Sequence, residues 1–241
     1  MTEPLAGSES PEALADAANL DAQAQDPRNP WRTLARRVVY ANSWMTVRED
    51  SVIRPDGQPG IYGVVEIRPS VGIIAIDDAP TPAPAGAADG GARRQEAPEA
   101  GAALSEPRIA LVSQWRYTLG KVSLEIPTGG SEAGERLLDA ARRELAEEVG
   151  VAADGWVWAG SIDNSNGVTT DVAHIFIARG LSPLPGGRVR QGDEEIEVVW
   201  LPFSEAVARV LAGEITESVS VAGILRAEVL RAWRLRERAS G

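Results

Sequence analysis

Three glutamates, Glu144, Glu147 and Glu148, lie close together in the segment GGSEAGERLLDAARRELAEEVGV, residues 129–151. On an α-helix, residues at positions i, i+3 and i+4 share one face, so the three carboxylates are expected to project from the same side. Like charges at this spacing repel one another, and Arg143 relieves only part of the repulsion through Glu147. Carboxylate oxygens are the ligands that Mg²⁺ and Mn²⁺ prefer. The segment therefore indicates a divalent-cation site, with a solvated acidic face as the alternative.

A helix over residues 135–149 is predicted to carry these acids. The sequence PTGG at 127–130 ends the strand before it, and Gly150 is suited to end the helix because glycine readily adopts a left-handed cap conformation. An apolar stripe beside the acidic face is expected to pack on a sheet. The stripe consists of Leu138, Ala141, Leu145 and Val149.

The rest of the chain alternates strand-like segments, rich in β-branched and aromatic residues, with a few helical segments. This pattern predicts an α+β fold in which helices cover a mixed β-sheet. Further helices are expected at 204–212 and about 219–238. The expected strands are 46–53, 61–68, 71–77, 109–117, 122–127, 156–162, 172–178 and 195–202.

The composition restricts the functional class. The 241 residues are 44% hydrophobic and carry a formal net charge of −11, which favours a globular protein and argues against binding to nucleic acid. No membrane partner is expected, because the apolar runs are too short for a membrane helix. There is no cysteine, which excludes thiol chemistry, and the single histidine, His174, is expected to be a packing residue of a strand. No long apolar run or secretory signal is recognisable, so a cytoplasmic protein is expected.

Three regions are predicted along the chain. Residues 1–30 are expected to be a disordered acidic tail, 31–68 an N-terminal strand and hairpin region, and 69–241 the main domain. A low-complexity segment at about 78–107, rich in Ala, Pro and Gly, lies between two predicted strands. It is interpreted as an insertion into a hairpin, because long loops add closure entropy only slowly.

The acidic segment resembles the complete signature of the Nudix hydrolase family in both residue types and spacing. The matching positions are Gly129, Glu135, Arg143, Glu144, Leu145, Glu147, Glu148, Gly150 and Val151. The stretches SQWRY (113–117), LEIPTGG (124–130), 165–181, 193–206 and 213–225 are similar to those of ADP-ribose and nucleoside-diphosphate-sugar pyrophosphatases, so the resemblance covers roughly 31–230. It implies a Nudix α/β/α sandwich with a mixed β-sheet and an N-terminal β-hairpin region.

The same resemblance implies metal-dependent hydrolysis of the pyrophosphate bond of a nucleoside diphosphate linked to another moiety. ADP-ribose, cleaved to AMP and ribose 5-phosphate, is the leading substrate, and other nucleotide sugars remain open. One departure bears on this choice: Asn166-Gly167 stands where ADP-ribose pyrophosphatases tend to carry Pro-Gly. The alternatives are a house-cleaning nucleoside triphosphate pyrophosphohydrolase and a non-enzymatic ligand-sensing module.

The resemblance also assigns roles to residues. Arg143 is expected to hold a catalytic glutamate, Glu135 to secure the loop–helix geometry or an outer metal shell, and Glu194, beside Asp193 and Glu195, to act as general base. Acidic residues that merely solvate a strand entrance are the alternative for this last group. The expected ligands of Mg²⁺ or Mn²⁺ are Glu144, Glu148, Glu147 and the carbonyl of Thr128.

Substrate contacts are expected from arginines outside the acidic helix. Arg116 is the principal candidate for the phosphates and Arg68 a weaker one, whereas Glu125 either faces the substrate or pairs with an arginine. A base could stack on Trp31, Trp44 or Trp115, although tryptophan is more often a packing residue. The N-terminal region 31–67 resembles the segment that relatives exchange across a dimer, so a homodimer with substrate pockets near that interface is expected.

Overall fold

The computed structural model describes residues 26–78, 106–188 and 195–239, with side chains up to residue 231. These residues form two compact units. The first contains 26–67 together with Ser165–Thr170, and the second contains the remaining described residues. The expected tail at 1–30 lies outside the described residues except for 26–30, and the expected insertion at 78–107 does so except at its two ends.

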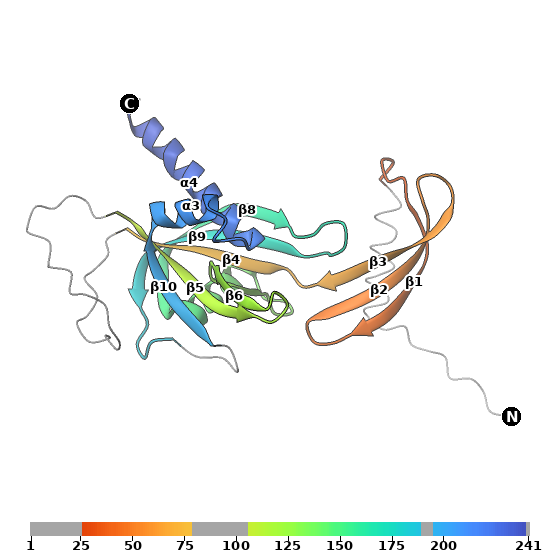
Figure 1. Ribbon diagram of the computed structural model, residues 1–241, viewed down its shortest axis with the longest axis horizontal. Helices are drawn as coiled ribbons and strands as arrows, with labels where there is room; N and C mark the ends of the chain where they lie inside the picture. Colours follow the sequence, from red (N-terminus) through yellow and green to blue (C-terminus); the bar gives the residue numbers. More distant parts are fainter. Residues whose placement is uncertain (1–25, 79–105, 189–194, 240–241) are drawn as a thin grey trace, which may run out of the picture. The chain divides into compact units, whose positions relative to one another are not determined.

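The first unit is a three-stranded antiparallel sheet in the order β1-β2-β3 (Figure 1). Its strands are β1 (Arg32–Ala41), β2 (Met45–Ile53) and β3 (Pro59–Ile67). The sequence predicted β2 and β3 but missed β1, which pairs along its length with β2 from Arg32↔Ile53 to Ala41↔Thr46. The apolar residues of β1 do not alternate, and its side chains are largely exposed, so it carries no strand signal of its own.

The segment Ser165–Thr170 belongs to this first unit. Val65 forms a parallel bridge with Thr169, and the Tyr62 hydroxyl donates to the carbonyl of Gly167 at 3.0 Å. Gly167 is part of the Asn-Gly pair that departs from the Pro-Gly of ADP-ribose pyrophosphatases. The pair therefore lies against β3.

The second unit contains a seven-stranded mixed sheet in the order β10-β5-β4-β9-β8, with β6 pairing with β5 and β7 with β4. Only β4 and β9 run parallel among the paired strands described. The strands are β4 (Ser70–Asp77), β5 (Arg108–Arg116), β6 (Lys121–Glu125), β7 (Thr128–Gly130), β8 (Val151–Asp163), β9 (Val172–Pro183) and β10 (Ile196–Pro202). The short β7 was not predicted, because its sequence TGG contains two glycines.

Helices cover both faces of this sheet. They are α2 (Leu137–Glu144), which continues as the π-helical turn η1 (Leu145–Val149), α3 (Phe203–Leu211) and α4 (Ser218–Ala239). Successive side chains of strand β4 point to opposite faces of the sheet and so contact the two helical layers in turn. Ile73 packs with Ala141 and Leu145 on one face, and Ile74 packs with residues of α3 and α4 on the other. Figure 1 shows α3 and α4 together on one side of the sheet. The predicted α/β/α sandwich is confirmed.

Strands β4 and β5 form the predicted hairpin around the low-complexity segment, with pairing at Ile76↔Ile109 and Asp77↔Arg108. Two further contacts lie at the ends of this segment: Arg179 pairs with Asp78, and the Ser204 N–H donates to Glu106 at 2.9 Å. Among the described residues, none of the helices has the length and apolar character needed to cross a bilayer.

Candidate active site

The acidic helix is shorter than predicted and ends in a wider turn. It begins at Leu137 rather than at residue 135, and its last turn, which contains Glu147 and Glu148, is π-helical. The simple α-helical spacing of the acids therefore does not apply to this turn, and π-turns are frequent at functional sites. Gly150 ends the helix with φ 79°, as predicted.

Glu144 lies directly against Gly129 of β7. A Cβ atom on Gly129 would lie 2.0 Å from the Cδ atom of Glu144, so the carboxylate would have to move to make room for it. The carboxylate is largely buried, with Glu144 8% exposed. The absence of a side chain at Gly129 therefore leaves the space that the carboxylate occupies on the strand.

Glu148 meets the same strand one residue earlier. Its Oε2 atom accepts a hydrogen bond from the backbone N–H of Thr128 at 2.9 Å, and Glu148 is 7% exposed. The expected metal ligands Glu144, Glu148 and Thr128 are thus brought together by the packing of α2 and η1 on β7. The third acid, Glu147, contacts Arg143 instead, at 3.2 Å.

Arg143 is the centre of a set of hydrogen bonds that ties the helix to the loop before it. Its guanidinium donates to Glu144 at 2.6 Å, to Glu135 at 3.0 and 3.1 Å, and to the carbonyl of Gly130 at 2.9 Å. Glu135 in turn accepts from the backbone N–H of Glu132 at 2.9 Å. Arg143 thus contacts both an acid of the helix and the loop 130–135.

These contacts shift the ionisation of both partners. The hydrogen bonds from Arg143, and then the one from the Glu132 N–H, lower the pKa of Glu135 below its usual value. The hydrogen bonds to Glu135, together with the charge of Glu144, raise the pKa of Arg143 despite partial burial. Both groups are therefore charged at neutral pH.

The donor set suits a hard divalent cation. Buried carboxylates and a backbone carbonyl are oxygen ligands of the kind that Mg²⁺ and Mn²⁺ take, and the strand leaves space for Glu144 only because Gly129 has no Cβ. In the described part of the chain, no three acidic or histidine side chains are already arranged so that they could hold an ion. Glu144 and Glu147 instead face Arg143, so binding an ion requires their carboxylates to turn towards it.

Arg116, the expected phosphate contact, forms an ion pair with Glu125 across the β5–β6 hairpin. Its Nε atom lies 3.0 Å from Oε1 of Glu125, whose side chain is only 1% exposed. Of the two roles that the sequence left open for Glu125, this contact is the pairing with an arginine. Arg68 is exposed in the connection between β3 and β4.

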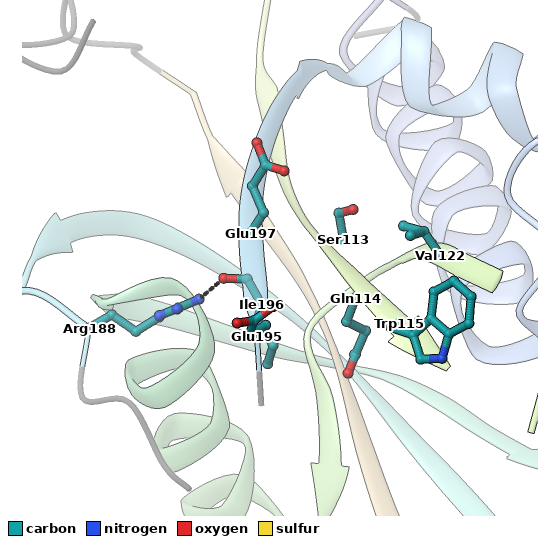
Figure 2. A pocket seen from close by; sticks show the side chains of 8 residues that line it. All are labelled: Ser113, Gln114, Trp115, Val122, Arg188, Glu195, Ile196 and Glu197. Atoms are coloured by element: carbon teal, nitrogen blue, oxygen red, sulfur yellow. Dashed lines mark hydrogen bonds between the residues drawn. The ribbon is translucent and has the colours of Figure 1, made fainter. Parts of the chain in front are cut away.

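A cavity of about 510 Å³ lies where β5, β6 and β10 meet. Figure 2 shows Trp115 at one side and the Glu195 and Glu197 side chains at the other, with the buried Gln114 between them. Arg188 donates to the carbonyl of Ile196 at 2.6 Å at the rim. The sequence named Trp115 and Glu195 and included Gln114 in the SQWRY stretch without giving it a role, whereas Arg188 was not considered. The expected general base, Glu194, and its neighbour Asp193 lie outside the described residues.

The other aromatic candidates belong to the first unit. Trp31 packs edge-on against Tyr62 with ring centroids 5.3 Å apart, and both line a cavity of about 340 Å³. Trp44 is 74% exposed after β1. His174 is half-buried within β9, where it pairs with Val71 and Ser161, in agreement with a packing role.

Two known domain families match parts of this chain. Residues 95–219, just over half of the chain, match the NUDIX domain, and residues 31–65 match the N-terminal domain of nucleoside diphosphate sugar hydrolases. The chain belongs to the NUDIX family. The enzyme class expected from the sequence, a Nudix hydrolase acting on compounds linked to a nucleoside diphosphate, is confirmed.

Several known proteins resemble this NUDIX chain over most of its length. An ADP-ribose pyrophosphatase of Mycobacterium tuberculosis is 28% identical over 81% of the chain and 82% of its own length. A methanol dehydrogenase activator of Bacillus methanolicus is 29% identical over 80% of the chain and 90% of its own length. The crystal structure of an ADP compounds hydrolase superposes with a TM-score of 0.64 at 19% identity, covering 86% of the chain and 95% of that structure, which supports the fold.

Proposed function

We propose that this Nudix hydrolase cleaves the pyrophosphate bond of ADP-ribose to give AMP and ribose 5-phosphate, with Mg²⁺ or Mn²⁺ as its cofactor. The observation that carries the proposal is the meeting of two buried glutamates, Glu144 and Glu148, with the backbone at Thr128 and Gly129. The substrate is proposed from two similar ADP-ribose pyrophosphatases, of Mycobacterium tuberculosis and Bacillus subtilis, at 28% and 25% identity over about four-fifths of the chain.

The charges of the protein and of the substrate explain why a cation is needed. The substrate is an anion, and the protein carries a formal net charge of −11. A bound divalent ion supplies positive charge and lowers the pKa of a coordinated water. Glu144, Glu148, Glu147 and the Thr128 carbonyl are the proposed holders of this ion.

The other residues proposed for the site hold a neighbouring side chain in position, bind the substrate phosphates or accept a proton. Arg143 orients Glu144, to which it donates at 2.6 Å, and Glu135 fixes Arg143 against the loop. Arg116 is the proposed contact for a substrate phosphate, held in place by Glu125, and Arg68 is a second one. Glu194 is the proposed general base that takes the proton of the attacking water.

A different nucleotide sugar is the second candidate. A GDP-mannose pyrophosphatase of Cronobacter sakazakii is 36% identical over 83 residues, a third of the chain. The Asn166-Gly167 pair, which differs from the Pro-Gly typical of ADP-ribose pyrophosphatases, also favours keeping this candidate.

We further propose that residues 31–68 form a dimerisation region of a cytoplasmic homodimer. The first unit exposes several large apolar side chains, which supports this, because apolar surface is a common feature of protein–protein contacts. They include Leu34, Val38, Tyr40, Trp44 and Ile61, each more than half exposed.

A substrate panel tests the proposed reaction. Purified protein is incubated with ADP-ribose, GDP-mannose and ATP, each with Mg²⁺ or Mn²⁺, and the products are separated by ion-exchange chromatography. AMP and ribose 5-phosphate from ADP-ribose at the highest kcat/KM support the proposal. A higher kcat/KM for GDP-mannose would transfer it to the second candidate, and hydrolysis of ATP alone would contradict both.

A further inference from the structure

The hydroxyl of Ser220 is buried at the start of α4, on the face of the sheet opposite the acidic helix. It donates to Oε2 of Glu217 at 2.7 Å and accepts from the backbone N–H of Ile126 at 2.9 Å. A hydroxyl has one hydrogen to donate, and here that hydrogen points to Glu217. The oxygen of Ser220 is thereby left as an acceptor aimed at Ile126.

Glu217 fixes Ser220 by capping the helix. Its carboxylate also accepts from the backbone N–H groups of Val219 at 2.8 Å and of Ser220 at 2.7 Å. These N–H groups lie in the first turn of α4, where they have no partner within the helix. The Glu217 carboxylate, which accepts hydrogen bonds at both of its oxygens, therefore fixes the Ser220 hydroxyl relative to the first turn of α4.

On the other side of Ser220 the hydrogen bonds continue to the acidic helix. The carbonyl of Ile126 accepts from the Thr128 hydroxyl at 2.7 Å, and the backbone N–H of Thr128 donates to Glu148 at 2.9 Å. Between them Pro127 has no N–H, and its carbonyl accepts from the N–H of Ile73 at 2.9 Å. In the short connection between β6 and β7, nearly every polar backbone group thus has a hydrogen-bond partner.

We propose that Ser220 is a positioning residue for Glu148, acting through Ile126 and Thr128. The inference rests on the proposed function, because Glu148 is a proposed ligand of the divalent ion. Ser220 touches neither substrate nor ion. The Ser220 hydroxyl sets the position of the Ile126 N–H, and the Thr128 hydroxyl fixes the carbonyl of Ile126. The Thr128 N–H then orients the Glu148 carboxylate.

The physical reason is that this connection is buried and short. Ile126 and Ser220 are both fully buried, so water does not replace the hydroxyl as an acceptor for the Ile126 N–H. When the acceptor is removed, the connection shifts to find another partner, and the Thr128 N–H moves with it. Groups that orient metal ligands in this way typically change metal affinity by about 10- to 100-fold.

The test compares Ser220→Ala with Ser218→Ala in the full chain. Ser218 lies in the same turn and also contacts Glu217, at 3.3 Å, but its other partner is Asn164. Two measurements are made without substrate: hydrogen–deuterium exchange of the peptide covering 124–130 in metal-free protein, and Mn²⁺ binding by titration calorimetry. Thr128→Val, which breaks the same chain of bonds at its other end, is the second variant in case Ser220→Ala folds poorly.

Ser220→Ala is expected to accelerate exchange in 124–130 and to weaken Mn²⁺ binding about tenfold, the lower end of the usual range. Ser218→Ala is expected to leave both within twofold of the wild type. Unchanged exchange in Ser220→Ala overturns the inference, and so does faster exchange with unchanged Mn²⁺ binding, which would make Ser220 purely structural. Failure of the proposed function is recognised separately, because Glu148→Gln would then bind Mn²⁺ as the wild type does.

Discussion

The carboxylate of Glu144 occupies the space in which any side chain on Gly129 would begin. The two residues belong to different elements, α2 and β7, and a Cβ on Gly129 would lie 2.0–2.4 Å from the carboxylate atoms of Glu144. A side chain at position 129 would therefore push the Glu144 carboxylate away from the strand.

Gly129→Ala is expected to displace Glu144 and to lower kcat/KM by at least about 100-fold, since a misplaced catalytic group costs on this order. Gly130→Ala is the matched control, because a Cβ there meets nothing within 4 Å. Steady-state kinetics with ADP-ribose and Mg²⁺ measure the effect. Equal activity of the two variants would contradict the proposed role of Glu144.

Arg143→Lys is expected to lower kcat by about tenfold or more while the fold is retained. Lysine keeps the charge but cannot reproduce the fork that joins Glu135 and Glu144, to which Arg143 donates at 3.0 and 2.6 Å. Arg142→Lys, at a neighbouring residue that pairs with the exposed Asp139, serves as the control and is expected to behave as the wild type. A normal kcat in Arg143→Lys would show that charge alone suffices.

The stability of the protein is expected to fall in acid partly through Glu135. Arg143 and the Glu132 N–H lower the pKa of Glu135 in the folded state, so the unfolded chain binds the proton more readily. The stabilisation is therefore complete above the unfolded pKa of Glu135, which is about 4.5, and is lost as the pH falls through the lower folded pKa. Urea unfolding from pH 7 to pH 3 should show a shallower decline in Glu135→Gln than in the wild type.

Arg116→Ala is expected to destabilise the fold by about 2–4 kcal/mol as well as to raise KM, because the buried Glu125 loses its ion-pair partner. The double variant Arg116→Ala/Glu125→Gln removes the unpaired charge and should recover part of the stability but none of the substrate affinity. Urea unfolding and kinetics separate the two effects. Recovery of KM in the double variant would argue that Arg116 does not contact the phosphate.

Sedimentation equilibrium at micromolar concentration is expected to give the mass of a homodimer. Trp44→Ser/Ile61→Ser, which replaces two of the exposed apolar side chains of the first unit, is expected to shift the mass towards the monomer. A wild-type protein that is monomeric at this concentration would rule out the proposed dimer.

The sequence alone predicted the elements whose signal is local. The stripe of Leu138, Ala141, Leu145 and Val149 identified both the helix and its buried face, and Gly150 marked its end. Strand β7 was missed because two of its three residues are glycines, which have low strand propensity, and it pairs only because β4 lies beside it. The π-turn at 145–149 was also missed, since no residue type encodes it.

For the candidate site, residue types were predictable but their partners were not. The signature named Glu144, Glu148 and Gly129, yet it gave no reason for the glycine beyond backbone freedom, whereas the structure assigns it to a steric contact. The ion pair of Arg116 with Glu125 was left open because these residues are not opposite each other. The register of β5 and β6 places Val112 opposite Glu125 and Arg116 opposite Lys121, so the contact depends on how the two side chains are directed. Ser220 was not considered, because its contact with Ile126 spans 94 residues of chain.

The pairing of Asp77 with Arg108 has a practical consequence for engineering. These residues lie at the mouth of the β4–β5 hairpin, so the polypeptide leaves the sheet and returns to it at adjacent points. The stretch between Asp78 and Glu106 is therefore expected to accept a fluorescent reporter or an affinity handle without moving either strand, provided that these two residues are kept, since they contact Arg179 and Ser204. It offers a site for immobilising or labelling the enzyme that leaves both of its ends unmodified.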